Sequence, residues 1–207
     1  MGMFEDVHKH LLNVTPERPQ VLREMENYAE ETDFPIVGPL VGRLLYQLTI
    51  LTKARKILEL GSGYGYSAFW FSMASGGRGQ ITMTDNNIKN KKLAMDFFKR
   101  AGLRSHFDYK VGDSLKIAKR LSGPFDIIFN DVSKKYYPAT IDLVAPLLKK
   151  GGLFITDNLL VEGKVYAKTT EKSLKAVKEF TESLYKDSRF FTTIMPLRDG
   201  VSIAVRL

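Results

Sequence analysis

The chain has 207 residues, of which 44% are hydrophobic, and its formal net charge is +8. This length suits one domain, or one domain with an N-terminal extension, and the apolar content is enough for a full core. No apolar run approaches the roughly 18–20 residues that span a membrane, and the first residues lack a secretion-signal pattern. The absence of cysteine excludes disulfides and thiolate metal sites. We therefore expect a cytoplasmic protein.

The N-terminal part of the sequence has the apolar spacing of helices. Apolar residues recur at helical intervals over residues 17–31 and again over 40–52, and Pro35–Pro39 breaks the chain between these two segments. We assign residues 1–34 to an N-terminal helical extension and residues 35–207 to a single domain.

Strand and helix signals alternate through the rest of the chain. Strands are predicted at 56–60, 81–85, 107–111, 125–130, 152–156, 190–196 and 201–206, and helices at 66–75, 88–101, 114–121, 139–149 and 170–186. This alternation predicts an α/β fold with one doubly wound, mostly parallel sheet of seven strands. The tight link Arg198-Asp199-Gly200 turns the last two strands into a C-terminal antiparallel hairpin.

The first strand of the predicted sheet runs into a glycine-rich turn. The segment from Glu59 to Gly65 reads E-x-G-x-G-x-G and leads into a helix, which brings backbone N–H groups close to a ligand. The dinucleotide fingerprint does not fit, because its third glycine would fall at Tyr66. The acid before the glycines would repel a pyrophosphate but suits a cationic ligand such as S-adenosylmethionine (SAM). The alternative is an ordinary strand–glycine–helix turn with a surface glutamate.

Polar residues follow the next four strands, at Asp85, Asp113-Ser114, Asp131 and Asp157-Asn158. The carboxyl ends of parallel strands share one edge of the sheet, and ligands bind there. We expect Asp85 to accept hydrogen bonds from the ribose hydroxyls of the cofactor and Asp113-Ser114 to bind an adenine edge. Each of these residues also has an alternative use, as a helix cap or in an Asx turn.

The residues at the last two of these strand ends could bind a hard cation. Asp131, Asp157 and Asn158 offer three oxygen ligands from neighbouring strands, which favours Mg²⁺ over zinc. Lys134 follows Asp131 by three residues, so a helical turn would return its amine toward the carboxylate and the metal. A bound cation would favour the neutral amine, which can act as a general base. The alternative for Lys134 is a surface salt bridge.

Four segments of the chain resemble the cation-dependent O-methyltransferases, the family of the caffeoyl-CoA and catechol enzymes. They are the cofactor loop Gly61–Ser67, the D-x-x-K-x-x-Y motif of Asp131–Tyr137, the GG…DN motif of Gly151–Asn158, and Asp199–Ala204. Seven strands that end in a hairpin are also the class I methyltransferase arrangement. The resemblance runs from about Pro35 to the C-terminus.

The resemblance implies roles for individual residues. Cofactor contacts would be made by Val37, Glu59, Gly61, Gly63, Ser67, Asp85, Asp113, Ser114 and Asp131. The divalent cation would be bound by Asp131, Asp157 and Asn158, and Lys134 would be the catalytic base. The chain departs from the plant-type enzymes at Ser133, where they have a second acid. Residues 159–170, in the region where family members recognise substrate, match nothing specific.

We expect a divalent-metal-dependent O-methyltransferase that moves the SAM methyl group to a small vicinal-diol or phenolic acceptor, of the catechol or hydroxycinnamoyl type. The charge of +8 fits either a solvated basic surface or a polyanionic substrate. The second interpretation makes the alternative a tRNA methyltransferase that acts on wobble 5-hydroxyuridine. A further alternative is a SAM-binding protein without catalysis. The apolar N-terminal helices predict a homodimer.

Overall fold

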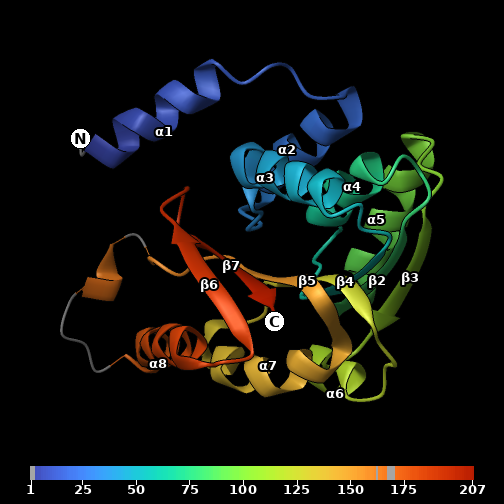
Figure 1. Cartoon of the computed structure of the whole chain (residues 1–207). Coiled ribbons are helices and arrows are strands. Elements are labelled where there is room, and N and C mark those ends of the chain that lie inside the picture. The colour runs from blue at the N-terminus through green and yellow to red at the C-terminus, as the bar shows by residue number, and fades with distance from the viewer. Residues whose placement is uncertain (1–2, 162, 167–170) are drawn as a thin grey trace.

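The structure is a computed structural model that describes residues 3–161, 163–166 and 171–207 (Figure 1). Its helices are α1 (Met3–Asn13), α2 (Gln20–Thr32), α3 (Gly38–Leu51), α4 (Tyr66–Ala74), α5 (Ile88–Arg100), α6 (Ser114–Ala118), α7 (Tyr137–Val144) and α8 (Lys172–Lys186). Its strands are β1 (Lys56–Leu60), β2 (Gln80–Asp85), β3 (His106–Val111), β4 (Phe125–Asn130), β5 (Leu148–Thr156), β6 (Phe190–Met195) and β7 (Val201–Arg206). Short 3-10 turns lie at Lys134–Tyr136, Ala145–Leu147 and Lys164–Tyr166.

The strands form one seven-stranded sheet in the order β3-β2-β1-β4-β5-β7-β6. The pairs that join β3, β2, β1, β4 and β5 are parallel, whereas β7 is antiparallel to both β5 and β6. The predicted α/β class, the mostly parallel sheet and the C-terminal antiparallel hairpin are therefore confirmed. The strand order reverses between β1 and β4, which is where open sheets of this kind leave a crevice for a ligand.

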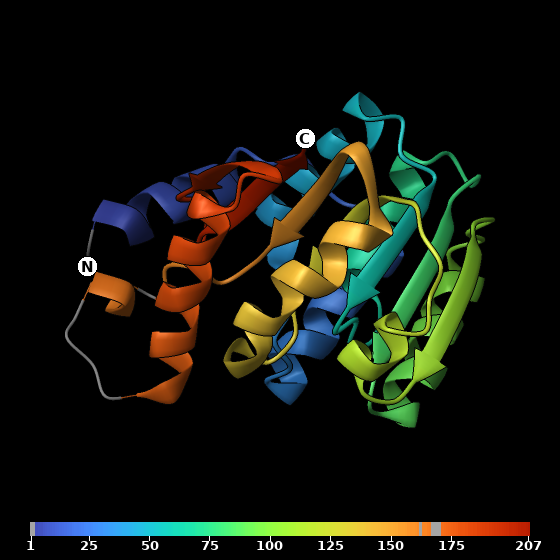
Figure 2. The same ribbon diagram turned by 60° about the horizontal axis from the view of Figure 1, so that its bottom comes forward.

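Helices cover both faces of the sheet (Figures 1 and 2). One apolar core lies between the sheet and α2 to α5, and a second core lies between the sheet and α6 to α8. Helix α2 belongs fully to the first core, because Leu22 and Met25 are completely buried and the Tyr64 hydroxyl donates to the Met25 carbonyl at 2.8 Å. The division of the chain at residue 34 stays a prediction.

The central strand β1 shows why the sequence folds this way. Ile57 packs into one core and Leu58 into the other, so the strand is apolar on both sides, as strands of covered parallel sheets are. Glu59 is the exception, since it is charged in sequence and yet completely buried. A buried acid within an apolar strand points to a function at the end of that strand.

The segment between residues 137 and 156 differs from the prediction of a helix over 139–149 and a strand over 152–156. Helix α7 ends at Val144, a 3-10 turn follows, and β5 already begins at Leu148. The pair Gly151-Gly152 looks like a turn in sequence but lies inside this strand, where Lys150 and Gly151 are exposed to solvent. The strand pairs with β4 at Phe125↔Leu148, before an irregular step in register.

Helix α1 was not predicted as an element, and it lies at the rim of the molecule in Figure 1. Its Val7 is exposed, and exposed apolar side chains also occur at Leu51, the end of α3, and at Phe191 on the edge strand β6. Such side chains are compatible with a homodimer, which stays a prediction. None of the helices in the described part of the chain is long and apolar enough to cross a membrane.

Candidate active site

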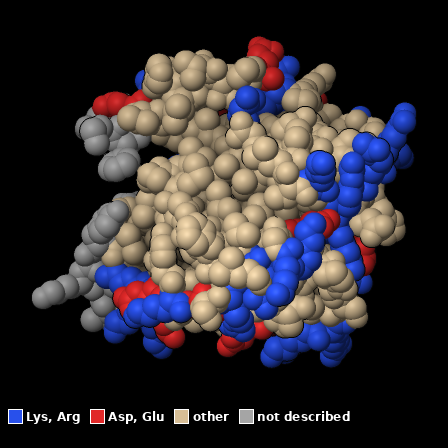
Figure 3. Space-filling model, viewed as in Figure 1, with Lys and Arg blue, Asp and Glu red and all other residues tan. Residues whose placement is uncertain are grey.

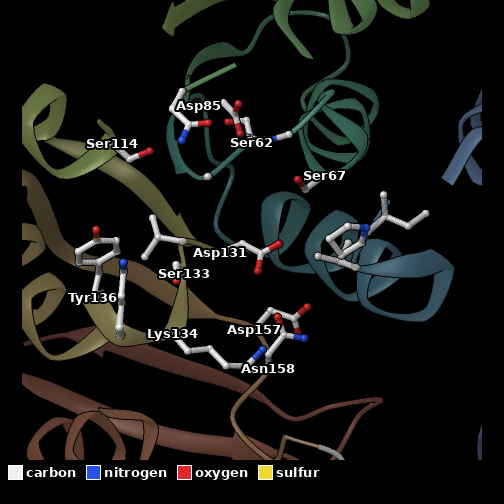
Figure 4. Close-up of a pocket in the computed structure, with 18 of the residues that line it drawn as sticks. Ser62, Ser67, Asp85, Ser114, Asp131, Ser133, Lys134, Tyr136, Asp157 and Asn158 are labelled. Atoms are coloured by element: carbon white, nitrogen blue, oxygen red, sulfur yellow. Dashed lines mark hydrogen bonds between the residues drawn. The ribbon is translucent and has the colours of Figure 1, made fainter. Parts of the chain in front are cut away.

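A cavity of about 950 Å³ opens at the carboxyl ends of the parallel strands, around the point where the strand order reverses. Figure 4 shows polar side chains that converge on it from several of these strand ends. The predicted site residues that line the cavity are Val37, Gly61, Gly63, Ser67, Asp85, Asp113, Ser114, Asp131, Lys134, Asp157 and Asn158. Glu59 is the predicted residue that does not line it.

The glycine loop joins the ends of three strands through close backbone contacts. Gly61 has a φ of +85°, and a Cβ at this position would lie 2.5 Å from the backbone oxygen of Asp131, just beyond β4. The backbone N–H of Gly63 donates to Asp85 Oδ2, at the end of β2, at 3.2 Å. Gly63 has a φ of +49°, and a Cβ there would lie 2.9 Å from Phe34 Cε1, so local geometry favours glycine at both positions. These contacts distinguish the loop from an ordinary strand–glycine–helix turn.

Glu59 lies behind the cavity wall. Its Oε1 accepts a hydrogen bond from the Ser67 hydroxyl, whereas its Oε2 is buried without a hydrogen-bond partner among the described residues. Burial raises the pKa of Glu59 to about 8, although the Ser67 hydrogen bond acts in the opposite direction. Ser67 itself lines the cavity, so Glu59 orients this hydroxyl from behind. With its raised pKa, Glu59 is mostly protonated at neutral pH in the ligand-free protein, and a cation bound nearby would favour its charged form.

The end of β2 holds an ordered carboxylate. Asp85 accepts hydrogen bonds from the backbone of Gly63, from the backbone of Asn87 at 2.8 Å and from the Asn90 amide at 3.0 Å. At the end of β3, Asp113 caps α6 by accepting from the Lys116 N–H at 2.9 Å. Capping and cavity lining therefore coexist in Asp113, as its position in the sequence allows.

Two carboxylates and an amide meet where β4 and β5 end (Figure 4). Asp157 has a relative exposure of only 1%, and burial raises its pKa to about 6 although Arg198 beside it acts in the opposite direction. Burial, together with the charges of Asp157 and Glu59, raises the pKa of Asp131 well above its usual range. Asn158 follows directly with a left-handed backbone, at a φ of +63°.

These oxygens fit a hard cation. Both carboxylate oxygens of Asp157 are buried without a hydrogen-bond partner among the described residues, and leaving buried acceptors unsatisfied is costly. A divalent cation would satisfy them, and Asp131 and Asn158 complete an all-oxygen set. No cluster of three or more His, Cys, Asp or Glu residues suited to a metal occurs in the described residues, so an amide is needed to complete this set.

Lys134 opens the 3-10 turn Lys134–Tyr136, so the expected helical turn after Asp131 is present. Its side chain points toward Asp157 and Asn158 in Figure 4. The ammonium also acts on both neighbouring carboxylates, since its charge opposes the rise in the pKa of Asp131 and of Asp157. Ser133, the departure from the plant-type pattern, is exposed at the cavity wall.

Two further residues complete the site, and sequence reasoning gave neither of them a role. The buried Tyr137 hydroxyl donates to the Asp157 carbonyl at 2.8 Å and so fixes the end of β5. Its place as the last residue of D-x-x-K-x-x-Y was the available signal. Arg198 Nη1 lies 3.7 Å from Asp157 Oδ2. The sequence around Arg198 reads only as a hairpin turn, and nothing in it indicated this contact.

The seven-stranded sheet with its antiparallel hairpin, and the cavity at its switch point, define a Rossmann-like fold that a solved O-methyltransferase structure shares. The sequence model of the O-methyltransferase family matches residues 9–207, and the chain therefore belongs to that family. It is a SAM-dependent O-methyltransferase of the catechol and caffeoyl-CoA kind, which confirms the predicted family and enzyme class.

Similar proteins cover nearly the whole chain. A catechol O-methyltransferase of Niastella koreensis is 28% identical over 98% of this chain and 97% of the relative. A probable caffeoyl-CoA O-methyltransferase of Arabidopsis thaliana is 30% identical over 98% and 94%. Among solved structures, the Bacillus cereus O-methyltransferase in complex with SAH has a TM-score of 0.88, with 25% identity over 99% of this chain and 100% of the other.

Proposed function

We propose that the protein transfers the SAM methyl group to a hydroxyl of a small vicinal-diol phenol with the help of a divalent cation. The observation that carries this proposal is the buried Asp157, whose carboxylate oxygens have no hydrogen-bond partner among the described residues. Asp157 lies in the same cavity as the glycine loop and Lys134. A cation site and a cofactor site that share one cavity are what this reaction needs.

The cofactor would lie along the glycine loop. Asp85, held by three donors, would accept hydrogen bonds from the ribose hydroxyls, and Asp113 and Ser114, which line the same cavity, would border the adenine. Ser67, backed by Glu59, would bind the charged methionine end. Val37, at the start of α3, and Asp131 line the same cavity and would enclose that end.

The reacting end of the cavity would use Asp131, Asp157 and Asn158 as ligands of the cation, with Mg²⁺ the expected metal. A bound divalent cation supplies Lewis acidity to a substrate hydroxyl. Lys134 Nζ would accept the proton of that hydroxyl, and the enclosing wall would align the oxygen with the SAM methyl group. Transfer from a sulfonium to an oxyanion disperses charge, so a cavity that excludes water favours it.

The proposed acceptor is a small phenol, as the names of the catechol and caffeoyl-CoA relatives support. On the face shown in Figure 3, basic side chains lie mainly toward the lower and right-hand parts and are mixed with acidic ones around α8. A solvated basic surface accounts for this distribution. No specific contact favours the tRNA alternative, and we do not propose it.

The test measures transfer from labelled SAM to a panel of vicinal diols, with total RNA as a separate acceptor. We expect transfer to a diol with Mg²⁺, loss of it in EDTA and recovery when Mg²⁺ is restored. Asp157→Asn should lower kcat at least 100-fold but retain SAH binding, seen as a ligand-induced shift in Tm. The control is Asp142→Asn, whose side chain is 89% exposed on α7. Full activity in EDTA refutes the metal requirement, and labelling of RNA alone refutes the proposed acceptor.

A further inference from the structure

Arg198 extends across one wall of the cavity. It lies in the turn between β6 and β7, and its guanidinium approaches Asp157 Oδ2 at 3.7 Å. Its Nε also lies 4.0 Å from the position that a Cβ on Gly38 would occupy, at the start of α3. The side chain therefore connects the hairpin turn, the proposed metal ligands and the loop near the methionine end of the cofactor. It lines the same cavity as Lys134.

Backbone hydrogen bonds hold the turn that carries this side chain. The Leu159 N–H donates to the Gly200 carbonyl at 3.0 Å, and the Leu160 N–H donates to the Asp199 carbonyl at 2.7 Å. The hairpin turn is thus hydrogen-bonded to the segment that directly follows Asp157 and Asn158, the proposed metal ligands after β5. Arg198 itself has a φ of +52°, a left-handed conformation that costs free energy in a residue with a large side chain. A strained arginine beside an active site is consistent with a functional role.

The guanidinium has unused hydrogen-bonding capacity. Arginine carries five N–H donors, yet Arg198 makes no hydrogen bond to the described residues, and 3.7 Å is too long for one to Asp157. The side chain is 35% exposed, toward the cavity. Arg189 provides the contrast, since its guanidinium donates to both Asp187 and Asp142.

The binding of a cation would compensate the carboxylates whose charges act on Arg198, which are those of Asp157 and Asp131. When Asp157 ligates a divalent cation, its negative charge is compensated there, and the nearby guanidinium is left facing the cavity with its donors free. A planar oxyanion matches the fork of those donors, which can bind both oxygens of a carboxylate at once. The hairpin backbone keeps the base of this side chain at the cavity wall.

We infer that Arg198 binds an anionic substituent of the acceptor, of the carboxylate kind, and so selects acidic diols over neutral or cationic ones. The inference rests on the proposed function and adds a substrate property to it. In the bound complex, the diol oxygens would lie at the metal ligands and beside Lys134, while the carboxylate would lie against Arg198.

The experiment compares three probes that share one diol: 3,4-dihydroxybenzoate, its methyl ester and 3,4-dihydroxybenzylamine. We expect kcat/KM to be highest for the acid and lowest for the amine. Arg198→Gln should reduce the acid-to-ester ratio of kcat/KM roughly tenfold, about the effect of one charge-assisted hydrogen bond, and Arg198→Lys should restore part of it. Arg104→Gln removes an exposed arginine at the opposite edge of the sheet and should keep the wild-type ratio.

Calorimetric titration of the acid and the ester into the protein with SAH and Mg²⁺ gives a second measurement, which needs no turnover. Equal affinity of the wild-type protein for the acid and the ester overturns the inference. So does an Arg198→Gln variant that weakens all three probes by the same factor, because Arg198 would then only position the metal ligands. If none of the probes is methylated, the proposed function fails, and the titrations still decide whether Arg198 selects the anion.

Discussion

Glu59→Gln should make the ligand-free protein more resistant to alkaline pH. Glu59 is completely buried, and one of its carboxylate oxygens has no hydrogen-bond partner among the described residues. The glutamine side chain has nearly the same shape but cannot ionise, and its oxygen can still accept the hydrogen bond from Ser67. The variant therefore removes the charge while the packing of β1 is retained.

The sign and size of the effect follow from the raised pKa of Glu59. The pKa is 4.5 in the reference state and about 8 in the folded protein, so the folded state binds the proton more tightly. The stabilisation that this proton gives is complete below pH 4.5 and is lost as the pH rises through 8. Between pH 6 and pH 9 the wild type should lose about 2 to 3 kcal/mol of unfolding free energy relative to Glu59→Gln.

Denaturant unfolding at pH 6, 7, 8 and 9 without ligand measures this difference, with the fluorescence of Trp70, the single tryptophan, as the probe. Glu182→Gln is the control for loss of one carboxylate, because its side chain is 71% exposed on α8. A Glu59→Gln difference that stays constant with pH would refute the reasoning. The affinity for SAH should be lower in Glu59→Gln than in the wild type, because the variant cannot offer a negative charge near the methionine end of the cofactor.

Three further substitutions test single parts of the site. Lys134→Ala should lower kcat at least 100-fold while the Kd for SAH changes little, and an equal loss in both would contradict its role as base. Gly61→Ala should destabilise the protein by about 1–3 kcal/mol, because its Cβ would strike the backbone of Asp131. The matched control Gly76→Ala also has a positive φ, but a Cβ there meets nothing within 4 Å, so its smaller loss in thermal unfolding isolates the clash. Asp85→Asn should weaken SAH binding about tenfold with little change in Tm, and unchanged affinity would exclude the proposed ribose contact.

Much of the fold could be predicted because its signals are local. Apolar runs such as Ile57–Leu60, glycine turns and the order of strands and helices are all visible in one dimension, and they define a parallel sheet. The start of β5 was missed because it is marked by the pairing of Leu148 with Phe125 of β4, which the sequence does not show, and Lys150 and Gly151 fall at the irregular step in register that follows. Helix α1 was missed although its signal is also local, since Phe4, Val7 and Leu11 recur at helical intervals.

The site was predictable where strand ends carry its residues, since topology brings such ends together. Asp85, Asp131 and Asp157 were found in this way, and all three line one cavity. The depth at which a side chain is buried could not be predicted. Glu59 was expected to contact the cofactor, but the structure buries it behind the cavity wall. Arg198 escaped notice because a turn residue has no periodicity, and its contact with Asp157 exists only once the hairpin is fastened beside β5.

The position of β7 has a consequence for how the enzyme is made. This strand is the last element of the chain described here, yet it fills an interior place in the sheet, between β5 and β6. While the ribosome is still adding residues 190–206, β5 has an unpaired edge, and the segment after Asp157 lacks the hairpin that fastens it. A nascent chain thus completes its candidate site only once β7 has been made, later than both helix layers and the glycine loop.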